Sequence, residues 1–245
     1  MKMDNQDILS DYNLRNDGRK VNESRSVHQK LGIFSQSSGS ASYQIGSTKV
    51  VAAVYGPHEI SEKKRSRSTG NKGFVNCQFS MATFATPERK NRPQNDHRSQ
   101  EINAQLNEIF ESMINLSDYS NSQIDIYVEA LQVDGGLFAA AVNAACLAVM
   151  NAGIDTRDVI GACSCGYYND EFLIDLNHFE ESQQALTQMT LVILSQTQQS
   201  VAIETSGRIS AEKLKQMTKF CQDGCNYSIK QMLKVTEEQL KQINM

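Results

Sequence analysis

The sequence of 245 residues has no tryptophan, only three prolines and no long apolar run. A membrane-spanning helix needs about 20 consecutive apolar residues, and no segment approaches that length, so we expect no part of the chain to lie in a bilayer. The first seven residues contain two aspartates and lack the apolar stretch of a secretory signal. With 40% hydrophobic and 21% charged residues, the composition is globular rather than disordered. The sequence therefore predicts a folded intracellular protein.

The signatures of several common enzyme classes are also missing. The chain contains no GxxxxGK[ST], GxGxxG, HExxH or GxSxG motif. Its six cysteines lie in apolar segments, and none of the four histidines is near a cysteine pair, which favours buried, reduced thiols over a zinc site. Cys163 and Cys165 have strand spacing and should face the same side, whereas Cys221 and Cys225 should share a helix face. We expect no metal and no cofactor.

Charge is unevenly distributed along the chain. The net charge of −4 argues against a free-standing nucleic-acid binder. Nevertheless, residues 61–98 contain nine basic and three acidic residues, whereas residues 134–200 contain one base, Arg157, and eight acids. A basic surface can attract a polyanion even on an acidic protein if the bases converge. The alternative is that the basic residues belong to two unrelated solvated loops.

The hydrophobic pattern predicts an α+β fold. Strands are predicted over 49–55, 74–84, 123–131, 162–167, 172–175, 189–194 and 201–204, and helices over 102–114, 139–150 and 211–243. The segment 38–42 is interpreted as a turn between strands rather than a phosphate loop. The turn Asp134-Gly135-Gly136 leads from a strand into a helix, where backbone N–H groups suit an oxyanion. This order mixes antiparallel strands with packed helices.

Several strings resemble, in order, the motifs of the RNase PH-like exoribonuclease family. They are Leu14-Arg15-x-Asp17-Gly18-Arg19-Lys20, Gly39-Ser40-Ala41, Gly46-x-Thr48-Lys49, Val54-Tyr55-Gly56-Pro57-His58-Glu59, Phe84-Ala85-Thr86-x-Glu88-Arg89-Lys90, Ile124-Asp125-Ile126, Leu131-Gln132-x-Asp134-Gly135-Gly136 and Asp155-x-x-Asp158. The resemblance implies duplicated βα modules like domain 2 of ribosomal protein S5, in one protomer of a six-subunit ring. We accordingly expect a flexible N-terminal segment over 1–13 and a single RNase PH-like domain over 14–245.

The resemblance also locates a catalytic site. Active members perform phosphorolysis, in which inorganic phosphate attacks the RNA 3′ end and releases nucleoside diphosphates. This needs cations and amides that hold the phosphate, further cations that hold the RNA, and an acid that helps the leaving oxygen depart. The family's RNA-binding arginine pair corresponds to His97 and Arg98, so half of it is retained.

The phosphate and acid positions of the family are altered in this chain. The phosphate cradle, which reads Gly-Thr/Ser-Arg in active members, is Gly136-Leu137-Phe138 here, so a hydroxyl donor and a guanidinium are both replaced by apolar groups. The acid pair corresponds to Glu181 and Thr187, and a threonine cannot act as an acid near neutral pH. The resemblance therefore implies that this chain is not an enzyme.

Basic residues that would contact RNA are better retained. By resemblance the loop with Lys63, Lys64, Arg65 and Arg67 faces the channel of the ring, and Arg89, Lys90, Arg92, His97 and Arg98 lie on the same side. Lysine and arginine contact a nucleic-acid backbone without a fixed geometry, and such contacts read no base sequence. The expected ligand is single-stranded RNA.

The resemblance thus implies a non-catalytic ring subunit of the RNA exosome. Such a subunit would line the channel that guides RNA to an associated hydrolytic 3′–5′ exoribonuclease, in ribosomal RNA processing and in RNA and mRNA degradation. The implied partners are other RNase PH-like ring subunits, notably one like ribosomal RNA-processing protein 45, and S1/KH cap subunits. The implied locations are nucleus, nucleolus and cytoplasm. The alternative is an active phosphate-dependent 3′–5′ exoribonuclease, with Arg98, Glu181 and a neighbouring subunit forming a composite site.

Overall fold

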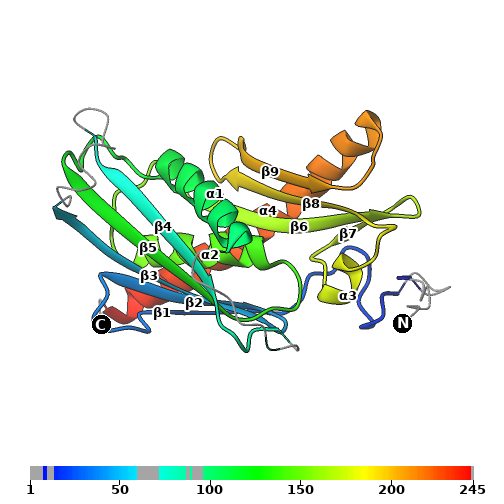
Figure 1. Ribbon diagram of the computed structural model, residues 1–245, viewed down its shortest axis with the longest axis horizontal. Coiled ribbons are helices and arrows are strands. Elements are labelled where there is room, and N and C mark those ends of the chain that lie inside the picture. The colour runs from blue at the N-terminus through cyan, green and yellow to red at the C-terminus, as the bar shows by residue number, and fades with distance from the viewer. Residues whose placement is uncertain (1–7, 10–13, 60–71, 87–88, 90–95, 244–245) are drawn as a thin grey trace.

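The computed structural model describes residues 8–9, 14–59, 72–86, 89 and 96–243. Within these ranges the chain forms two β-sheets and four helices, with the sheets at opposite ends of an elongated molecule (Figure 1). No helix in the described ranges combines the length and the hydropathy needed to traverse a bilayer.

The first sheet has five strands in the order β1-β2-β3-β5-β4. The strands are β1 (Val27–Leu31), β2 (Gly39–Ile45), β3 (Thr48–Glu59), β4 (Phe74–Met81) and β5 (Ser122–Gln132). All neighbours are antiparallel except β4 and β5, which run parallel. A parallel pair needs a crossover connection, and helix α1 (His97–Met113) provides it while packing on β4.

The second sheet is antiparallel, with the strand order β7-β6-β8-β9. Its strands are β6 (Ile160–Tyr168), β7 (Glu171–Ile174), β8 (Thr187–Leu194) and β9 (Ser200–Ser206). The short helix α3 (His178–Glu181) follows β7, and the long helix α4 (Ala211–Ile243) ends the described chain. Helix α4 packs on β6 and β8 and reaches β1 of the first sheet, so it ties the two sheets together.

Helix α2 (Leu137–Asn151) forms the centre of the core. It packs against β2, β3 and β5 on one side and β6 on the other, and its alanine-rich sequence is buried almost all around. A helix that is apolar on every side is stable only inside a protein. One continuous hydrophobic cluster therefore extends through both sheets, α1, α2 and α4.

The predicted elements all form, although β4 ends at Met81 rather than at residue 84 and α1 begins at His97 rather than at residue 102. Three larger differences remain. The chain begins a strand at Gly39, so the turn predicted over 38–42 is largely strand β2. Strand β3 does not stop before Gly56-Pro57 but continues to Glu59, because a register shift between Tyr55 and His58 accommodates the proline. Strand β1 and helix α3 were not predicted. The α+β class is confirmed.

The segment 1–13, predicted to be flexible, lies mostly outside the described residues. Of its two described residues, Ile8 is buried against Leu173, Leu176 and Leu186, and Leu9 forms a β-bridge with Arg15. This part of the N-terminal segment thus packs beside β7 on the second sheet.

Candidate functional site

The turn between β5 and α2 is the centre of the candidate site. Gly135 and Gly136 both have left-handed backbone angles, with φ of 79° and 64°. A Cβ atom on Gly135 would lie 2.5 Å from the carbonyl carbon of Asn177. Glycine is therefore required at 135, because the backbone after β7 passes directly against the turn. The sequence correctly predicts this turn and the helix N-terminus that follows it.

A buried arginine holds the turn in place. The Nη2 and Nε atoms of Arg25 donate to the two carboxylate oxygens of Asp175, at 2.6 and 2.9 Å. The same guanidinium donates to the carbonyls of Asp134, Gly135 and Leu176. Burial opposes the charge of Arg25, but the bond to Asp175 and the negative charges of Asp175, Asp134 and Glu181 together hold the pKa of Arg25 above its usual value. Arg25 thereby fixes the turn to the end of β7.

A carboxylate accepts a hydrogen bond from a backbone N–H of this turn. The Gly136 N–H, at the N-cap of α2, donates to Oε1 of Glu181 at 2.6 Å. Helix α3 presents this glutamate, and a capping box between Asn177 and Glu180 fixes the start of α3. Burial raises the pKa of Glu181, while the bond from Gly136 opposes that rise. An internal anion thus binds where the helix N-terminus would attract an external one.

Five of the predicted site residues, Arg98, Gly136, Leu137, Phe138 and Glu181, meet in one small pocket of about 120 Å³. Its walls are formed by Arg98, Gly136, Leu137, Phe138, Glu181, Gln188, Met189, Thr190, Glu204 and Ser206. The structure therefore brings together the cradle positions, one acid position and one position of the arginine pair. Arg98 is the only cation among these lining residues, and Glu181 and Glu204 are both carboxylates.

The structure differs from the prediction at Thr187, the second predicted acid position. Thr187 does not line the pocket, and its buried hydroxyl donates to the carbonyl of Arg208. Successive residues of a strand face opposite sides of the sheet, so the next residue of β8, Gln188, lines the pocket instead. Gln188 also donates to the carbonyl of Glu181. The carboxamide of Gln188 is no more able than a threonine to supply a proton near neutral pH.

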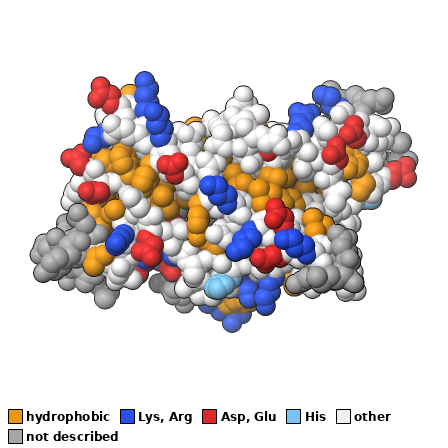
Figure 2. Space-filling model, turned by 180° about the vertical axis from the view of Figure 1, so that it is seen from behind, with side chains coloured by type: hydrophobic (Ala, Val, Ile, Leu, Met, Phe, Trp, Pro, Cys, Tyr) orange, Lys and Arg blue, Asp and Glu red, His pale blue; other side chains and the backbone are white. Residues whose placement is uncertain are grey.

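The predicted RNA-contact residues are only partly described. Lys63, Lys64, Arg65, Arg67, Lys90 and Arg92 lie outside the described residues. Arg89, His97 and Arg98 are exposed, and His97 and Arg98 open helix α1. On the face shown in Figure 2, described Lys and Arg side chains lie beside Asp and Glu side chains, so this face presents no continuous basic track.

Sequence reasoning did not find two of the functional positions. Arg25 precedes a short polar strand and carries no local signal, because its partners lie more than 100 residues away along the chain. Glu204 belongs to β9, which pairs with β8, and only this pairing places its carboxylate in the pocket. The family motifs located Asp134, Gly135 and Gly136 but not the residues that hold them.

Comparisons with known proteins agree with this architecture. Residues 23–155 match the 3′ exoribonuclease family, domain 1, and residues 158–224 match domain 2 of the same family. The chain is 46% identical over 211 residues to the exosome complex component RRP41 of Mus musculus, covering 86% of this chain and 85% of that protein. It is 36% identical over 230 residues to the RRP41 homolog of Arabidopsis thaliana, covering 94% of each.

Two solved structures show the same fold. One is rice (Oryza sativa) Rrp46, with a TM-score of 0.79 and 25% identity over 90% of this chain and 99% of that one. The other is the Archaeoglobus fulgidus exosome with RNA bound to the active site, with a TM-score of 0.77 and 21% identity over 90% and 93% of the two chains. Together with the family matches, these similarities show that the chain belongs to the RNase PH-like 3′ exoribonuclease family, as a homologue of the exosome components RRP41.

Proposed function

We propose that this chain is a non-catalytic ring subunit of an RNA exosome, which guides single-stranded RNA and leaves cleavage to an associated hydrolytic 3′–5′ exoribonuclease. Its relatives are exosome components RRP41, and its fold is shared with Rrp46. The proposed partners are RNase PH-like ring subunits, including one like ribosomal RNA-processing protein 45, and S1/KH cap subunits. The proposed locations are nucleus, nucleolus and cytoplasm.

The observation that carries the non-catalytic part is the bond from Gly136 N–H to Glu181. A phosphate that entered the pocket would compete with this carboxylate for the amide. It would also lie near a second carboxylate, Glu204, with Arg98 as the only cation among the described lining residues. Two like charges 4 Å apart repel by about 4 kcal/mol at an effective dielectric constant near 20. The pocket therefore disfavours the anionic co-substrate that phosphorolysis requires.

Phe138 adds a second obstacle. It follows the N-terminus of α2 at the position where active family members carry the arginine of the cradle, and it packs partly against the hydrophobic core. A phenyl ring offers no hydrogen-bond donor to a phosphate, and an anion without a paired cation loses several kcal/mol on desolvation. The phosphate site is thus filled by an internal acid and an apolar ring.

A phosphorolysis assay tests the proposal. The purified chain, alone and paired with its ring neighbour, is incubated with 3′-labelled RNA, magnesium and inorganic phosphate, and products are analysed for nucleoside diphosphates. We expect none above the level of a reaction without phosphate. Phosphate-dependent release of nucleoside diphosphates by the chain alone or by the pair would show that the non-catalytic assignment is wrong.

The RNA-guiding part has a separate test. Lys63, Lys64, Arg65 and Arg67 are changed together to glutamate in a reconstituted ring that carries a hydrolytic nuclease. Reversing four charges replaces attraction for the RNA backbone with repulsion, so we expect slower decay of RNA that must pass through the ring. Ring assembly, followed by size-exclusion chromatography, should be unchanged. Normal decay by a correctly assembled mutant ring would contradict RNA guidance by this loop.

One observation favours the alternative of an active phosphorolytic enzyme. Arg98 lines the same pocket as Gly136 and Glu181, so part of a catalytic arrangement is retained. A neighbouring subunit that contributed further cations would complete a composite site. Under this alternative the pair releases nucleoside diphosphates while the chain alone does not, and Arg98→Ala abolishes the release. The arm of the assay that uses the pair therefore separates the two functions.

A further inference from the structure

Three cysteines far from the Gly136 turn in sequence converge inside the second half of the fold. The Sγ atoms of Cys163 and Cys165 on β6 and of Cys221 on α4 all lie within 4.8 Å of one another. All three residues are buried, with at most 7% exposure. Among the described residues, this thiol cluster (Cys163, Cys165 and Cys221) is the one group of His, Cys, Asp or Glu side chains with a spacing that suits a metal ion.

The spacing of the thiol cluster matches thiolate coordination. Metal–sulfur bonds are about 2.3 Å long, so sulfur atoms around one tetrahedral or trigonal ion lie roughly 3.8–4.0 Å apart. The 4.8 Å limit on the three separations is close to that range, and rotation of the side chains can close the difference. The fourth cysteine of this region, Cys225, is not part of this group. Its Sγ donates to the carbonyl of Leu191, and the thiols of Cys163 and Cys221 likewise donate to the carbonyls of Ser164 and Cys163. The described geometry therefore offers three ligands and leaves one position open.

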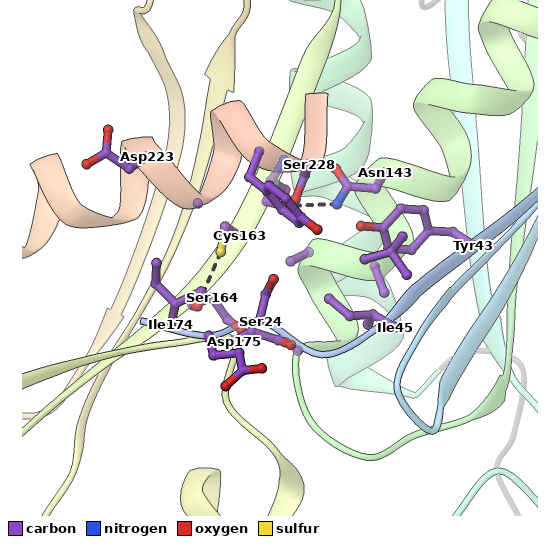
Figure 3. Close-up of a pocket in the computed structure, with 18 of the residues that line it drawn as sticks. Ser24, Tyr43, Ile45, Asn143, Cys163, Ser164, Ile174, Asp175, Asp223 and Ser228 are labelled. Carbon is purple, nitrogen blue, oxygen red and sulfur yellow. Dashed lines mark hydrogen bonds between the residues drawn. The ribbon is translucent and has the colours of Figure 1, made fainter. Parts of the chain in front are cut away.

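A pocket reaches one thiol of the cluster, that of Cys163. Cys163 lines a pocket of about 540 Å³ between β1, β2, α2, β6 and α4, and Figure 3 shows its sulfur directed toward Ser164, whose carbonyl it contacts. The wall of the same pocket carries the buried Tyr43 hydroxyl together with the polar side chains of Asn143 and Ser228. A buried polar wall of this kind suits ordered water. The pocket thus gives access to the cluster from the side of Cys163.

The approach of α4 to β6 depends on a glycine. A Cβ atom on Gly224 would lie 2.7 Å from Sγ of Cys163. Glycine is unfavourable in a helix interior, and Gly224 lies within α4, between Cys221 and Cys225. Its presence leaves room around the Cys163 sulfur and lets the Cys221 thiol reach the two thiols of β6. A site that needs three sulfurs in contact requires this close packing.

We propose that Cys163, Cys165 and Cys221 form a binding site for a thiophilic d¹⁰ cation, Zn²⁺ or Cu⁺. On binding, three S–H bonds break and release three protons to solvent, and three sulfur–metal bonds form, with no change of oxidation state. Soft thiolate ligands select such ions over magnesium or calcium. This inference differs from the sequence-based expectation of buried thiols and no metal, because the sequence does not show that β6 and α4 bring the sulfurs together.

Cadmium titration of the full chain tests the site. The reduced protein, stripped with a chelator, is titrated with Cd²⁺, and the near-ultraviolet thiolate-to-cadmium charge-transfer band is followed. We expect saturation at one equivalent, and displacement of Cd²⁺ by Zn²⁺ or by Cu⁺ identifies the preferred ion. Loss of hydrogen-bond partners outside the ligand shell already weakens metal sites by about 10–100-fold, so Cys165→Ala or Cys221→Ala should weaken binding by at least about 100-fold.

Matched controls separate coordination from general thiol reactivity. Cys77 and Cys146 are equally buried but lie outside the cluster, so Cys77→Ala and Cys146→Ala should keep the wild-type band and stoichiometry. Far-ultraviolet circular dichroism verifies that each variant is folded, and if one cluster variant unfolds, the other provides the test. The proposal is overturned if folded wild-type protein shows no band at one equivalent. It is equally overturned if the band survives in a folded cluster variant.

Discussion

Replacing Arg25 with methionine tests whether one buried guanidinium holds the turn between β5 and α2 in place. Methionine keeps much of the side-chain length but removes the charge and all side-chain donors. The wild-type guanidinium makes two bonds to the carboxylate of Asp175 and three to backbone carbonyls. In the variant these acceptors remain buried without those donors, and the carboxylate of Asp175 loses its closest counter-charge.

The expected loss of stability follows from these contacts. Removing one partner of a buried ion pair costs about 3–5 kcal/mol. Asp175 retains the backbone N–H of residue 25 at 2.8 Å and the guanidinium of Arg19 at 3.6 Å, so we expect the low end, about 3 kcal/mol. This is roughly a 150-fold change in the folding equilibrium. In a protein of this size it should lower Tm by about 6–12 °C.

Chemical denaturation followed by circular dichroism measures this loss. The control is Lys213→Met, which breaks an exposed ion pair with Asp170 at 2.9 Å and should change the stability little, because solvent screens such a pair. The double variant Arg25→Met/Asp175→Leu removes both charges and should recover part of the stability. If Arg25→Met costs less than about 1 kcal/mol, or no more than the control, the turn does not depend on this guanidinium.

Three further predictions concern the same scaffold. Gly135→Ala should lower the free energy of unfolding by more than about 3 kcal/mol, because the new Cβ would meet the Asn177 backbone at 2.5 Å. Gly153 has a similar φ of 68° but open space around it, so Gly153→Ala should cost only about 1–2 kcal/mol. Equal losses in denaturant unfolding would refute the close approach at Gly135. Burial raises the pKa of Glu181, so the stability linked to its protonation is present below the ordinary glutamate pKa and is lost as pH rises through the raised value. Glu181→Gln should therefore gain most over wild type near neutral pH, with a gain that shrinks on acidification, and a pH-independent difference would contradict the shift. Asn143→Ala removes the side chain that bonds the N–H and C=O of Ala162 between α2 and β6, and it should lower the free energy of unfolding by about 2–3 kcal/mol. Asn151→Ala loses one longer bond and should cost less than about 1 kcal/mol. Similar losses for the two variants would argue against the link through Asn143.

The local pattern of hydrophobic and polar residues was sufficient to predict most of the helices and strands. Alternation of Val75, Cys77 and Phe79 identified β4, and helical spacing identified α4 over the range that the structure shows. Strand β2 was interpreted as a turn because it is rich in Ser and Gly. These small residues are needed there, since a Cβ atom on Gly39 would lie 2.4 Å from the backbone of Ala148 in α2. The small residues are required by a contact with helix α2, which lies about 100 residues further along the chain. A short stretch of sequence around Gly39 therefore cannot reveal this requirement.

The candidate site, too, could be predicted from the sequence only in part. The ordered motifs identified the turn at Gly136, the cradle residues and Glu181, and the structure places them in one pocket. Thr187 lies outside this pocket and its neighbour Gln188 lines it, because successive residues of a strand face opposite sides of the sheet. The contact between Glu181 and the Gly136 amide could not be predicted, since it depends on how α3 is placed after β7.

By itself, the sequence determined the α+β class and the family, and it predicted apolar residues at the phosphate-cradle positions, because these depend on residue identity and local order. The tertiary structure alone decided which groups touch: Arg25 with Asp175, Glu181 with Gly136, and the three thiols with one another. The first two of these contacts join residues 150 and 45 apart in the sequence, and the third joins β6 to α4. Their geometry is set by the packing of α2, α3 and α4 against the sheets, and a linear pattern contains no information on that packing.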